Sequence, residues 1–106
     1  MNLNLANISP LPIPVIEFLN NICKSSQIHR LIVFGSRAHN DYQQYSDIDL
    51  AVDAPEITKK EWLNIKETAY YDVRTVLQIS LVHYNTNPQK LQNNIINTGE
   101  IIYVKH

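Results

Sequence analysis

The chain has 106 residues, of which 44% are hydrophobic and 18% are charged. This is the usage of a folded protein that is long enough for one compact core and too short for two. Nine Lys and Arg residues against ten Asp and Glu residues give a formal charge of -1, and the basic residues form no stripe. This argues against extended nucleic acid as the main partner, whereas a metal ion or a helix end can still hold a small anion. We expect a single domain over residues 1–106.

The N-terminal segment predicts a cytoplasmic protein. It lacks a basic leader, and Pro10, Pro12 and Pro14 interrupt its apolar residues, so we expect neither a signal peptide nor a membrane span. The single cysteine, Cys23, follows Leu19 at helical spacing within an apolar stretch. We expect it to be a buried structural thiol, because no neighbouring His or Cys would lower its pKa.

The hydrophobic pattern predicts alternating helices and strands. A first helix is expected over residues 14–24, because apolar residues recur there at helical spacing and Pro14 suits a first helical turn. Short apolar runs rich in β-branched residues predict buried strands at residues 29–34 and 48–52. The ten residues between Ser36 and Asp47 are expected to form a helix and a return loop.

The second half of the chain continues this alternation. Thr58 and Glu61 fit a capping box, which predicts a helix that ends near Tyr70. Alternating apolar residues predict a strand over 75–84. The remaining elements are a helix opened by Asn87 and Pro88 and closed by Gly99, and a strand over 101–104. The order predicts an α/β (α+β) fold, with a mixed sheet of about four strands covered by helices.

One segment combines a Gly-Ser turn with an Asp-x-Asp pair. Gly35 and Ser36 follow the first expected strand, and Asp47 and Asp49 open the second one after ten intervening residues. A strand that runs through Gly-Ser into a helix exposes backbone N–H groups, and glycine lets a phosphate approach them closely. We therefore expect Gly35 and Ser36 to bind a triphosphate.

The Asp-x-Asp pair indicates a magnesium site. Residues two apart on a strand point to the same face, so the carboxylates of Asp47 and Asp49 would lie roughly 6.6 Å apart along the backbone. Magnesium favours one or two carboxylates together with substrate phosphates, and two-ion phosphoryl-transfer sites hold their ions about 3.5 to 4 Å apart. The pair is therefore expected to hold Mg²⁺ in a site of the two-ion type, with the phosphates of a nucleoside triphosphate as further ligands.

These motifs resemble the minimal nucleotidyltransferase (MNT) domains of the DNA polymerase β-like superfamily. The resemblance covers nearly the whole chain, and its most specific part is the spacing of Gly35-Ser36-Arg37 from Ser46-Asp47-Ile48-Asp49-Leu50. The strand at residues 75–84 and the closing segment at 97–103 also fit. The resemblance implies the nucleotidyltransferase fold and an antitoxin that acts beside a HEPN-domain ribonuclease toxin. It further implies transfer of AMP from ATP to a tyrosine of that toxin.

The chain departs from the family pattern at the third carboxylate. Aligning Ile79-Ser80-Leu81-Val82 with the usual apolar-Asp-apolar-apolar strand puts Ser80 in its place, and no acid lies between Asp72 and Glu100. A serine hydroxyl neither ligates a catalytic metal well nor accepts the nucleophile's proton near neutral pH. An alternative function follows, in which a catalytically degenerate domain neutralises its HEPN partner by binding it.

Further polar residues have more than one interpretation. Arg37 directly follows the Gly-Ser turn, where it either neutralises a phosphate or faces solvent from a helix. His39 could contact the nucleotide, and Tyr42 and Tyr45 could stack on a base, face a partner or pack within their loop. Asp53 lies about 13 Å along the strand from Asp49, too far to share its ions, and is expected to be a surface or turn residue.

Other ligand classes fit this chain poorly. His29, His39, His83 and His106 show no paired ligand spacing, which argues against zinc, and His83 is expected to be a packed side chain. The two glycines of the chain exclude both the Rossmann pattern and the Walker A loop. A polymerase or tRNA nucleotidyltransferase would need a second domain and a basic groove.

Overall fold

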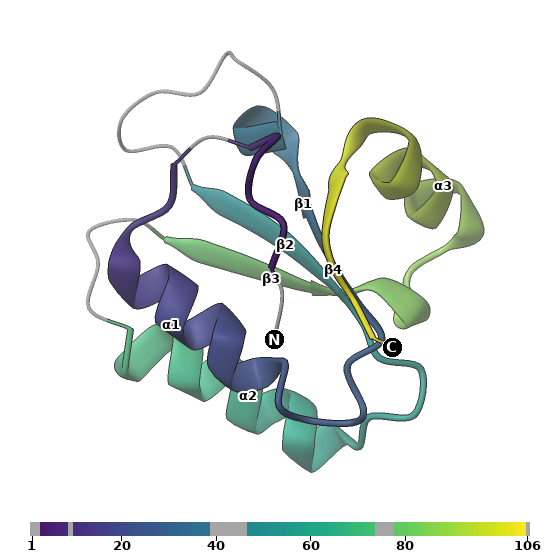
Figure 1. The fold of residues 1–106 in the computed structure, drawn as a ribbon. Coiled ribbons are helices and arrows are strands. Elements are labelled where there is room, and N and C mark those ends of the chain that lie inside the picture. Colours follow the sequence, from purple (N-terminus) through teal and green to yellow (C-terminus); the bar gives the residue numbers. More distant parts are fainter. Residues whose placement is uncertain (1–2, 9, 39–46, 74–77, 106) are drawn as a thin grey trace.

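A computed structural model describes residues 3–8, 10–38, 47–73 and 78–105. The strands are β1 (Arg30–Phe34), β2 (Ile48–Asp53), β3 (Ile79–His83) and β4 (Glu100–Val104). They lie side by side in the order β3-β2-β1-β4 (Figure 1). β1 is antiparallel to β2 and to β4, whereas β2 and β3 are parallel. The predicted mixed sheet of about four strands is thus confirmed.

Helices cover both faces of the sheet. α1 (Ile13–Ile22) and α2 (Lys59–Tyr71) pack on one face, and α3 (Gln89–Thr98) packs on the other (Figure 1). Because side chains alternate along a strand, β1 and β2 contribute to two separate apolar clusters. The cluster under α1 and α2 contains Leu31, Val33, Leu50 and Val52 of these strands, and the cluster under α3 contains Ile32 and Ala51.

Local signals in the sequence set where the helices begin. Pro14 lies in the first turn of α1, as expected, because a proline there forfeits no intrahelical hydrogen bond. At the start of α2 the predicted capping box is present. The Glu61 N–H donates to Thr58 Oγ1 at 3.1 Å, and the Thr58 N–H donates to Glu61 Oε1 at 3.3 Å. These bonds satisfy two backbone donors that a helix start otherwise leaves unpaired.

Gly99 ends α3, as predicted, but close packing is what requires a glycine there. Its φ of -92° is accessible to any residue, so the left-handed cap that glycine often supplies is not used. A Cβ at Gly99 would lie 2.6 Å from the Ile95 carbonyl oxygen and 2.9 Å from that of Val33. The missing side chain therefore lets the end of α3 approach β1.

Two predicted elements differ from the structure. The third strand was expected over residues 75–84, but β3 begins at Ile79 and Tyr84 opens a short 3₁₀ helix (Tyr84–Thr86), while residues 74–77 lie outside the described part. The helix expected after Gly35 is a four-residue 3₁₀ turn, η1 (Gly35–Ala38). Residues 39–46 of the expected return loop are not described. No helix in the described ranges is long and apolar enough to cross a membrane.

Cys23 and His83 are structural side chains, as the sequence predicts. Cys23 is buried, and burial raises the pKa of its thiol to about 11, so the reactive thiolate is scarce at neutral pH. His83 has its Nε2 atom 3.0 Å from the carbonyl oxygen of Ala54, and its ring lies 5.2 Å from that of Trp62, measured between centroids. Cys23 thus belongs to the core cluster at the end of α1, and His83 connects β3 with the end of β2 and with α2.

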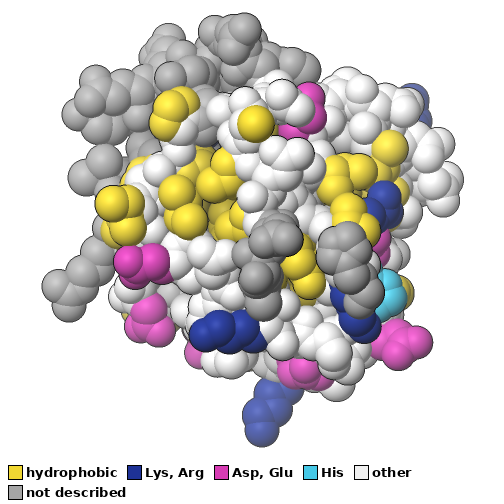
Figure 2. Space-filling model, viewed as in Figure 1, with side chains coloured by type: hydrophobic (Ala, Val, Ile, Leu, Met, Phe, Trp, Pro, Cys, Tyr) yellow, Lys and Arg dark blue, Asp and Glu magenta, His cyan; other side chains and the backbone are white. Residues whose placement is uncertain are grey.

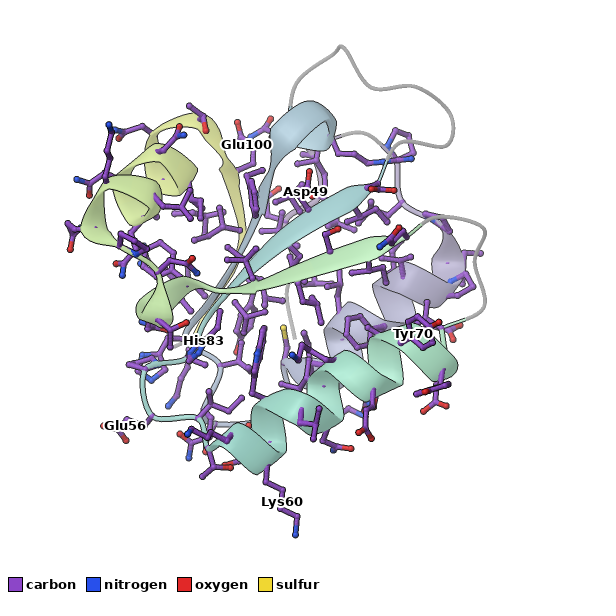
Figure 3. All side chains as sticks on the ribbon, turned by 180° about the vertical axis from the view of Figure 1, so that it is seen from behind. Asp49, Glu56, Lys60, Tyr70, His83 and Glu100 are labelled. Carbon is purple, nitrogen blue, oxygen red and sulfur yellow. The ribbon has the colours of Figure 1, made fainter. Side chains whose placement is uncertain are left out.

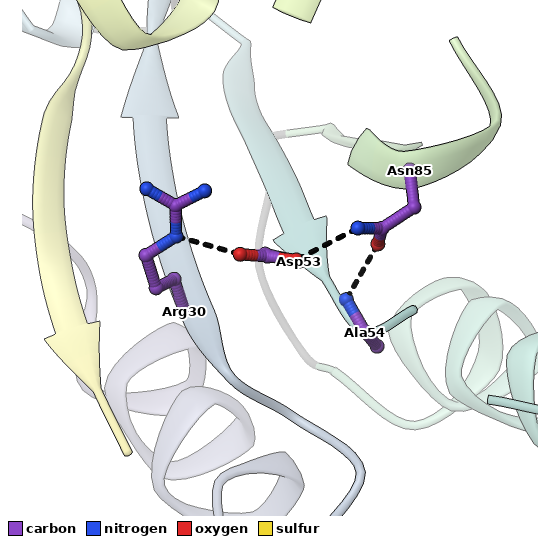
Figure 4. A network of polar contacts seen from close by, with 4 residues as sticks. All are labelled: Arg30, Asp53, Ala54 and Asn85. Atoms are coloured by element: carbon purple, nitrogen blue, oxygen red, sulfur yellow. Dashed lines mark hydrogen bonds and ion pairs between the residues drawn. The ribbon is translucent and has the colours of Figure 1, made fainter. Parts of the chain in front are cut away.

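Asp53 is buried, contrary to the expected surface or turn position. Its carboxylate accepts a hydrogen bond from Arg30 Nε at 2.6 Å and another from Asn85 Nδ2 at 2.8 Å (Figure 4). The Ala54 N–H in turn donates to Asn85 Oδ1 at 2.8 Å, and the Arg30 guanidinium lies 5.3 Å from the centroid of the Tyr84 ring. The network joins β1, β2 and the segment after β3, because Arg30 and Asp53 are paired across the sheet.

Asp53→Ala is expected to lower the free energy of unfolding by about 2 to 3 kcal/mol, because it leaves the Arg30 guanidinium and the Asn85 amide without their shared acceptor. Urea denaturation of the variant and of the native chain measures this difference in the free energy of unfolding. Glu56→Gln, at an exposed acid in the loop after β2, serves as a control and should change stability by less than about 0.5 kcal/mol. If Asp53→Ala behaved like the control, the network would contribute nothing to stability.

Candidate nucleotide and metal site

The Gly-Ser turn and the Asp pair meet at one edge of the sheet. β1 runs into Gly35, and antiparallel pairing sets Phe34, its last residue, opposite Asp49 of β2. Asp47 immediately precedes β2 and is exposed, whereas Asp49 is half-buried. Figure 3 shows Asp49 near this end of β2, beside the η1 turn. The pairing of β1 with β2 thus brings the two motifs of the sequence to one end of adjacent strands.

Gly35 touches the Asp49 carboxylate, a contact that the sequence pattern does not reveal. Its φ is +73°, in the left-handed region that disfavours other residues. A Cβ at this position would also collide with Asp49 Oδ2. Glycine is therefore required twice, once for the turn and once for the close approach of the backbone to the carboxylate. This contact brings the proposed phosphate cradle against the proposed metal ligand.

The residues after Gly35 differ from expectation. Because η1 is a single 3₁₀ turn, the helix that was expected to present its N–H groups to a phosphate is replaced by one short turn. Arg37 is 2% exposed, so its alternative as a solvent-facing residue is wrong. Its Nη1 donates to the carbonyl oxygen of Pro10 at 3.1 Å, which ties the turn to the segment before α1. A contact from Arg37 to phosphate stays a prediction, as does one from Ser36.

The electrostatics of the Asp pair favour a bound cation. Burial raises the pKa of the Asp49 carboxyl above its ordinary value, and repulsion from the negative charge of Asp47 raises it further. The folded chain thus holds two carboxylates close enough to repel each other, at a cost that a divalent cation would offset. Two carboxylates completed by substrate phosphates are a ligand set that magnesium favours, so Asp47 and Asp49 fit this metal.

Ser80 lies on β3 directly beside Asp49. The parallel pairing of β2 and β3 sets the Cα atoms of these two residues opposite each other. Since paired residues of adjacent strands project to the same face, Phe34, Asp49 and Ser80 form a row across three strands. This is the position from which the sequence alignment expects a third carboxylate to reach the metal.

No third acid joins the Asp pair in the part of the chain that the structure describes. Over that part, no three His, Cys, Asp or Glu residues group closely enough to hold a metal ion. The residue in register with Asp49 is a neutral serine, so the two aspartates are the only acidic side chains of the candidate site among the described residues. The candidate contacts His39, Tyr42 and Tyr45 lie outside the described residues and stay predictions.

Comparison with known proteins relates this geometry to a family. The model of the family described as "Polymerase beta, Nucleotidyltransferase" matches residues 17–106. No curated protein matches the chain.

Three solved structures are similar in fold. The first is a toxin-antitoxin crystal structure with AMP-PNP, with a TM-score of 0.62 and 19% identity over 88% of this chain and 73% of that one. The others are two mutants of the toxin-antitoxin MntA-HpeT. One has a TM-score of 0.58 and 17% identity over 87% and 71% of the two chains. The other has a TM-score of 0.60 and 19% identity over 92% of this chain and 76% of that one.

Proposed function

Since the chain belongs to the polymerase beta nucleotidyltransferase family, we propose that it is the antitoxin of a HEPN/MNT toxin-antitoxin pair. In this proposal it transfers AMP from magnesium-ATP to a tyrosine hydroxyl of its partner toxin. The family match also confirms the resemblance drawn from the Gly-Ser and Asp-x-Asp motifs. The observation that carries the proposed chemistry is the packing of the Asp49 carboxylate against the positive-φ turn at Gly35.

The residues of this edge have distinct proposed tasks. Asp47 and Asp49 hold magnesium, which when bound would neutralise the triphosphate and polarise the α-phosphate. Gly35, with no side chain, leaves its backbone open to the phosphates beside these carboxylates. Ser36 and Arg37 are proposed to bind the triphosphate as well. The partly buried ion pair of Arg30 and Asp53 lies at the far end of β2 and takes no part.

The proposed transfer replaces one bond at the α-phosphorus by another and releases one proton. The tyrosine oxygen forms a bond to the α-phosphorus while the bond from that phosphorus to the bridging oxygen breaks, and pyrophosphate leaves. The tyrosine hydroxyl proton must pass to an acceptor. A carboxylate in register with Asp49 would serve as that base, but Ser80 is neutral and accepts a proton poorly near neutral pH.

This last observation favours a second function. In the alternative, the chain binds nucleotide but turns over slowly or not at all, and neutralises its HEPN partner by binding. A triphosphate held by the Gly35 turn and the two aspartates does not need the third acid in order to bind. Ser80 therefore separates the two functions, because it weakens catalysis while leaving the binding groups in place.

The toxin partner is supported by the solved structures of similar fold. All three are toxin-antitoxin structures, and one of them contains AMP-PNP. Their identity to this chain is 19% or lower, so the likeness is one of fold, and the HEPN partner, the nucleotide and the cytoplasmic location belong to the proposal. The single domain over residues 1–106 likewise remains proposed.

Incubation of the chain and its HEPN partner with magnesium and ATP labelled on the α-phosphate tests the proposed function. Label on a partner tyrosine, located by mass spectrometry, would establish the transferase. A stable complex without label would establish the binding function instead. If the partner were neither labelled nor bound, both functions would be wrong.

A further inference from the structure

The residues before α1 lie across one face of the sheet, and we call them the N-terminal strap (residues 3–8 and 10–12). In Figure 1 the strap is the dark purple trace that passes across the sheet toward η1. The Asn4 N–H donates to the Ile102 carbonyl oxygen of β4 at 2.7 Å. In Figure 2, hydrophobic side chains gather across the middle of this face, and charged side chains lie mainly below them. The apolar residues of the strap that pack against the core cluster under α1 and α2 are Leu3, Leu5, Ile8 and Leu11.

The strap is joined to the turn that follows Gly35. Arg37 of η1 is 2% exposed, and its Nη1 donates to the Pro10 carbonyl oxygen at 3.1 Å. A guanidinium that is removed from water needs hydrogen-bond acceptors, so this contact holds η1 against the strap. Prolines at positions 10 and 12 restrict the backbone next to the acceptor, and Pro12 itself is extended. The carbonyl that accepts from Arg37 therefore belongs to a stiff part of the chain.

The strap supports η1 from the face opposite to Asp49. Ile48 and Leu50, the residues on either side of Asp49, belong to the apolar cluster that the strap covers. Because side chains alternate along a strand, Asp49 projects to the other face, where α3 packs. The strap can therefore act on the proposed nucleotide site through the turn, without lining it.

The turn needs such support, because its geometry is costly. η1 has only four residues, and Gly35 at its start combines a left-handed φ of +73° with close approach to the Asp49 carboxylate. Glycine loses more conformational freedom on ordering than any other residue. Backbone groups that bind phosphate must be ordered before binding or during it, and ordering during binding lowers affinity. A second fixed point two residues after Gly35 removes part of that cost.

We propose that the N-terminal strap fixes the Gly35 turn for nucleotide binding, with Arg37 as the positioning residue that connects the two. The strap is anchored in the core, the Pro10 carbonyl holds Arg37, and Arg37 holds η1 in the conformation that sets Gly35 against Asp49. This inference rests on the proposed function, and it gives Arg37 a task in triphosphate binding that needs no contact with phosphate.

A double-mutant cycle on the affinity for magnesium-ATP, measured by calorimetry with the full chain, tests the inference. Ile8→Ala with Leu11→Ala loosens the strap on both sides of Pro10. It is expected to weaken binding about 5- to 30-fold, the range by which ordering one backbone residue lowers affinity. Arg37→Ala is expected to weaken binding by a similar factor. All three substitutions together should bind within about 2-fold of Arg37→Ala alone, because both changes break the same connection.

Ile57→Ala with Ile65→Ala is the matched control. Both side chains pack against the same core cluster as the strap, from the loop after β2 and from α2. This variant should lower the melting temperature about as much as the strap variant does, yet bind magnesium-ATP within about 2-fold of the native chain. Affinity that follows the strap and not the general loss of packing separates positioning from a purely structural role. Thermal unfolding of each variant shows that it is folded.

Each failure has its own signature. If the strap variant bound magnesium-ATP like the control, the strap would have no part in the site, and this comparison decides the matter even if Arg37→Ala does not fold. If the effects of the strap variant and Arg37→Ala multiplied in the combined variant, Arg37 would act independently of the strap, and the inference would be wrong while the proposed function stood. If the native chain bound no magnesium-ATP, the proposed nucleotide site and the inference would fail together.

Discussion

Replacing Asp47 and Asp49 together by asparagine is expected to weaken the magnesium-dependent binding of ATP by at least about 100-fold, since even outer residues of a metal site cost 10- to 100-fold. The carboxamide groups retain the size of the side chains but remove both negative charges that hold the cation. Calorimetric titration with ATP, in magnesium and in EDTA, measures the effect. If the double variant bound magnesium-ATP as tightly as the native chain, the proposed site would be wrong.

The same double variant should keep or increase the stability of the fold without ligand. The pKa of Asp49 is raised by burial and by the charge of Asp47. A raised folded-state pKa means that the ionised carboxylate opposes folding above the unfolded pKa, and the neutral asparagine removes that opposition. Weaker nucleotide binding with undiminished stability would therefore separate loss of ligands from loss of fold. Asp72→Asn, at an exposed acid outside the site, is the control.

Ser80→Asp is expected to raise the rate of AMP transfer about 100- to 10,000-fold, the range over which a general acid or base acts. Ser80 is in register with Asp49 on the neighbouring parallel strand, so a carboxylate there would join the row that contains this proposed metal ligand. The added charge also increases repulsion within the site, and we expect activity of the variant to depend more steeply on magnesium.

Transfer of labelled AMP to the partner at saturating magnesium-ATP measures this rate. Ser80→Asn is the matched control, because it has nearly the size of aspartate without the charge, and it should leave the rate at the native level. Vigorous native transfer that Ser80→Asp did not change would show that another residue supplies the third ligand. The alignment of β3 with the family would then have to be redrawn.

Short-range signals predicted most of the fold. The capping box at Thr58 and Glu61, the proline in the first turn of α1 and the apolar runs of β1 and β2 each act over a few residues, and the structure contains all of them. The spacing of Gly35 from the Asp pair indicated that the two segments would meet, since antiparallel neighbours joined by one loop return to the same edge. The motifs therefore predicted that the Gly-Ser turn and the Asp pair lie at the same edge of the sheet.

Contacts between distant segments could not be predicted in the same way. The residues next to Asp53 in the sequence predict a surface position. In the structure Asp53 accepts hydrogen bonds from Arg30, 23 positions away, and from Asn85, 32 positions away. The sequence allows Arg37 to face solvent or to bind a phosphate. In the structure Arg37 is buried and its guanidinium donates to the Pro10 carbonyl, 27 positions away, which the sequence does not indicate. Burial of a charge depends on whether a partner is brought to it, and that depends on the packing of the whole sheet.

The sequence by itself determined the family, the helix starts and the buried strands, and it proposed Asp47 and Asp49 as metal ligands, because these inferences depend on residue type and short spacing. Only the tertiary structure decided that Gly35 touches Asp49 and that Ser80 stands in register with it. It also decided that Asp53 is buried against Arg30 and Asn85. Strand order and helix packing arise from side chains far apart in the chain, which share no local pattern until the core is formed.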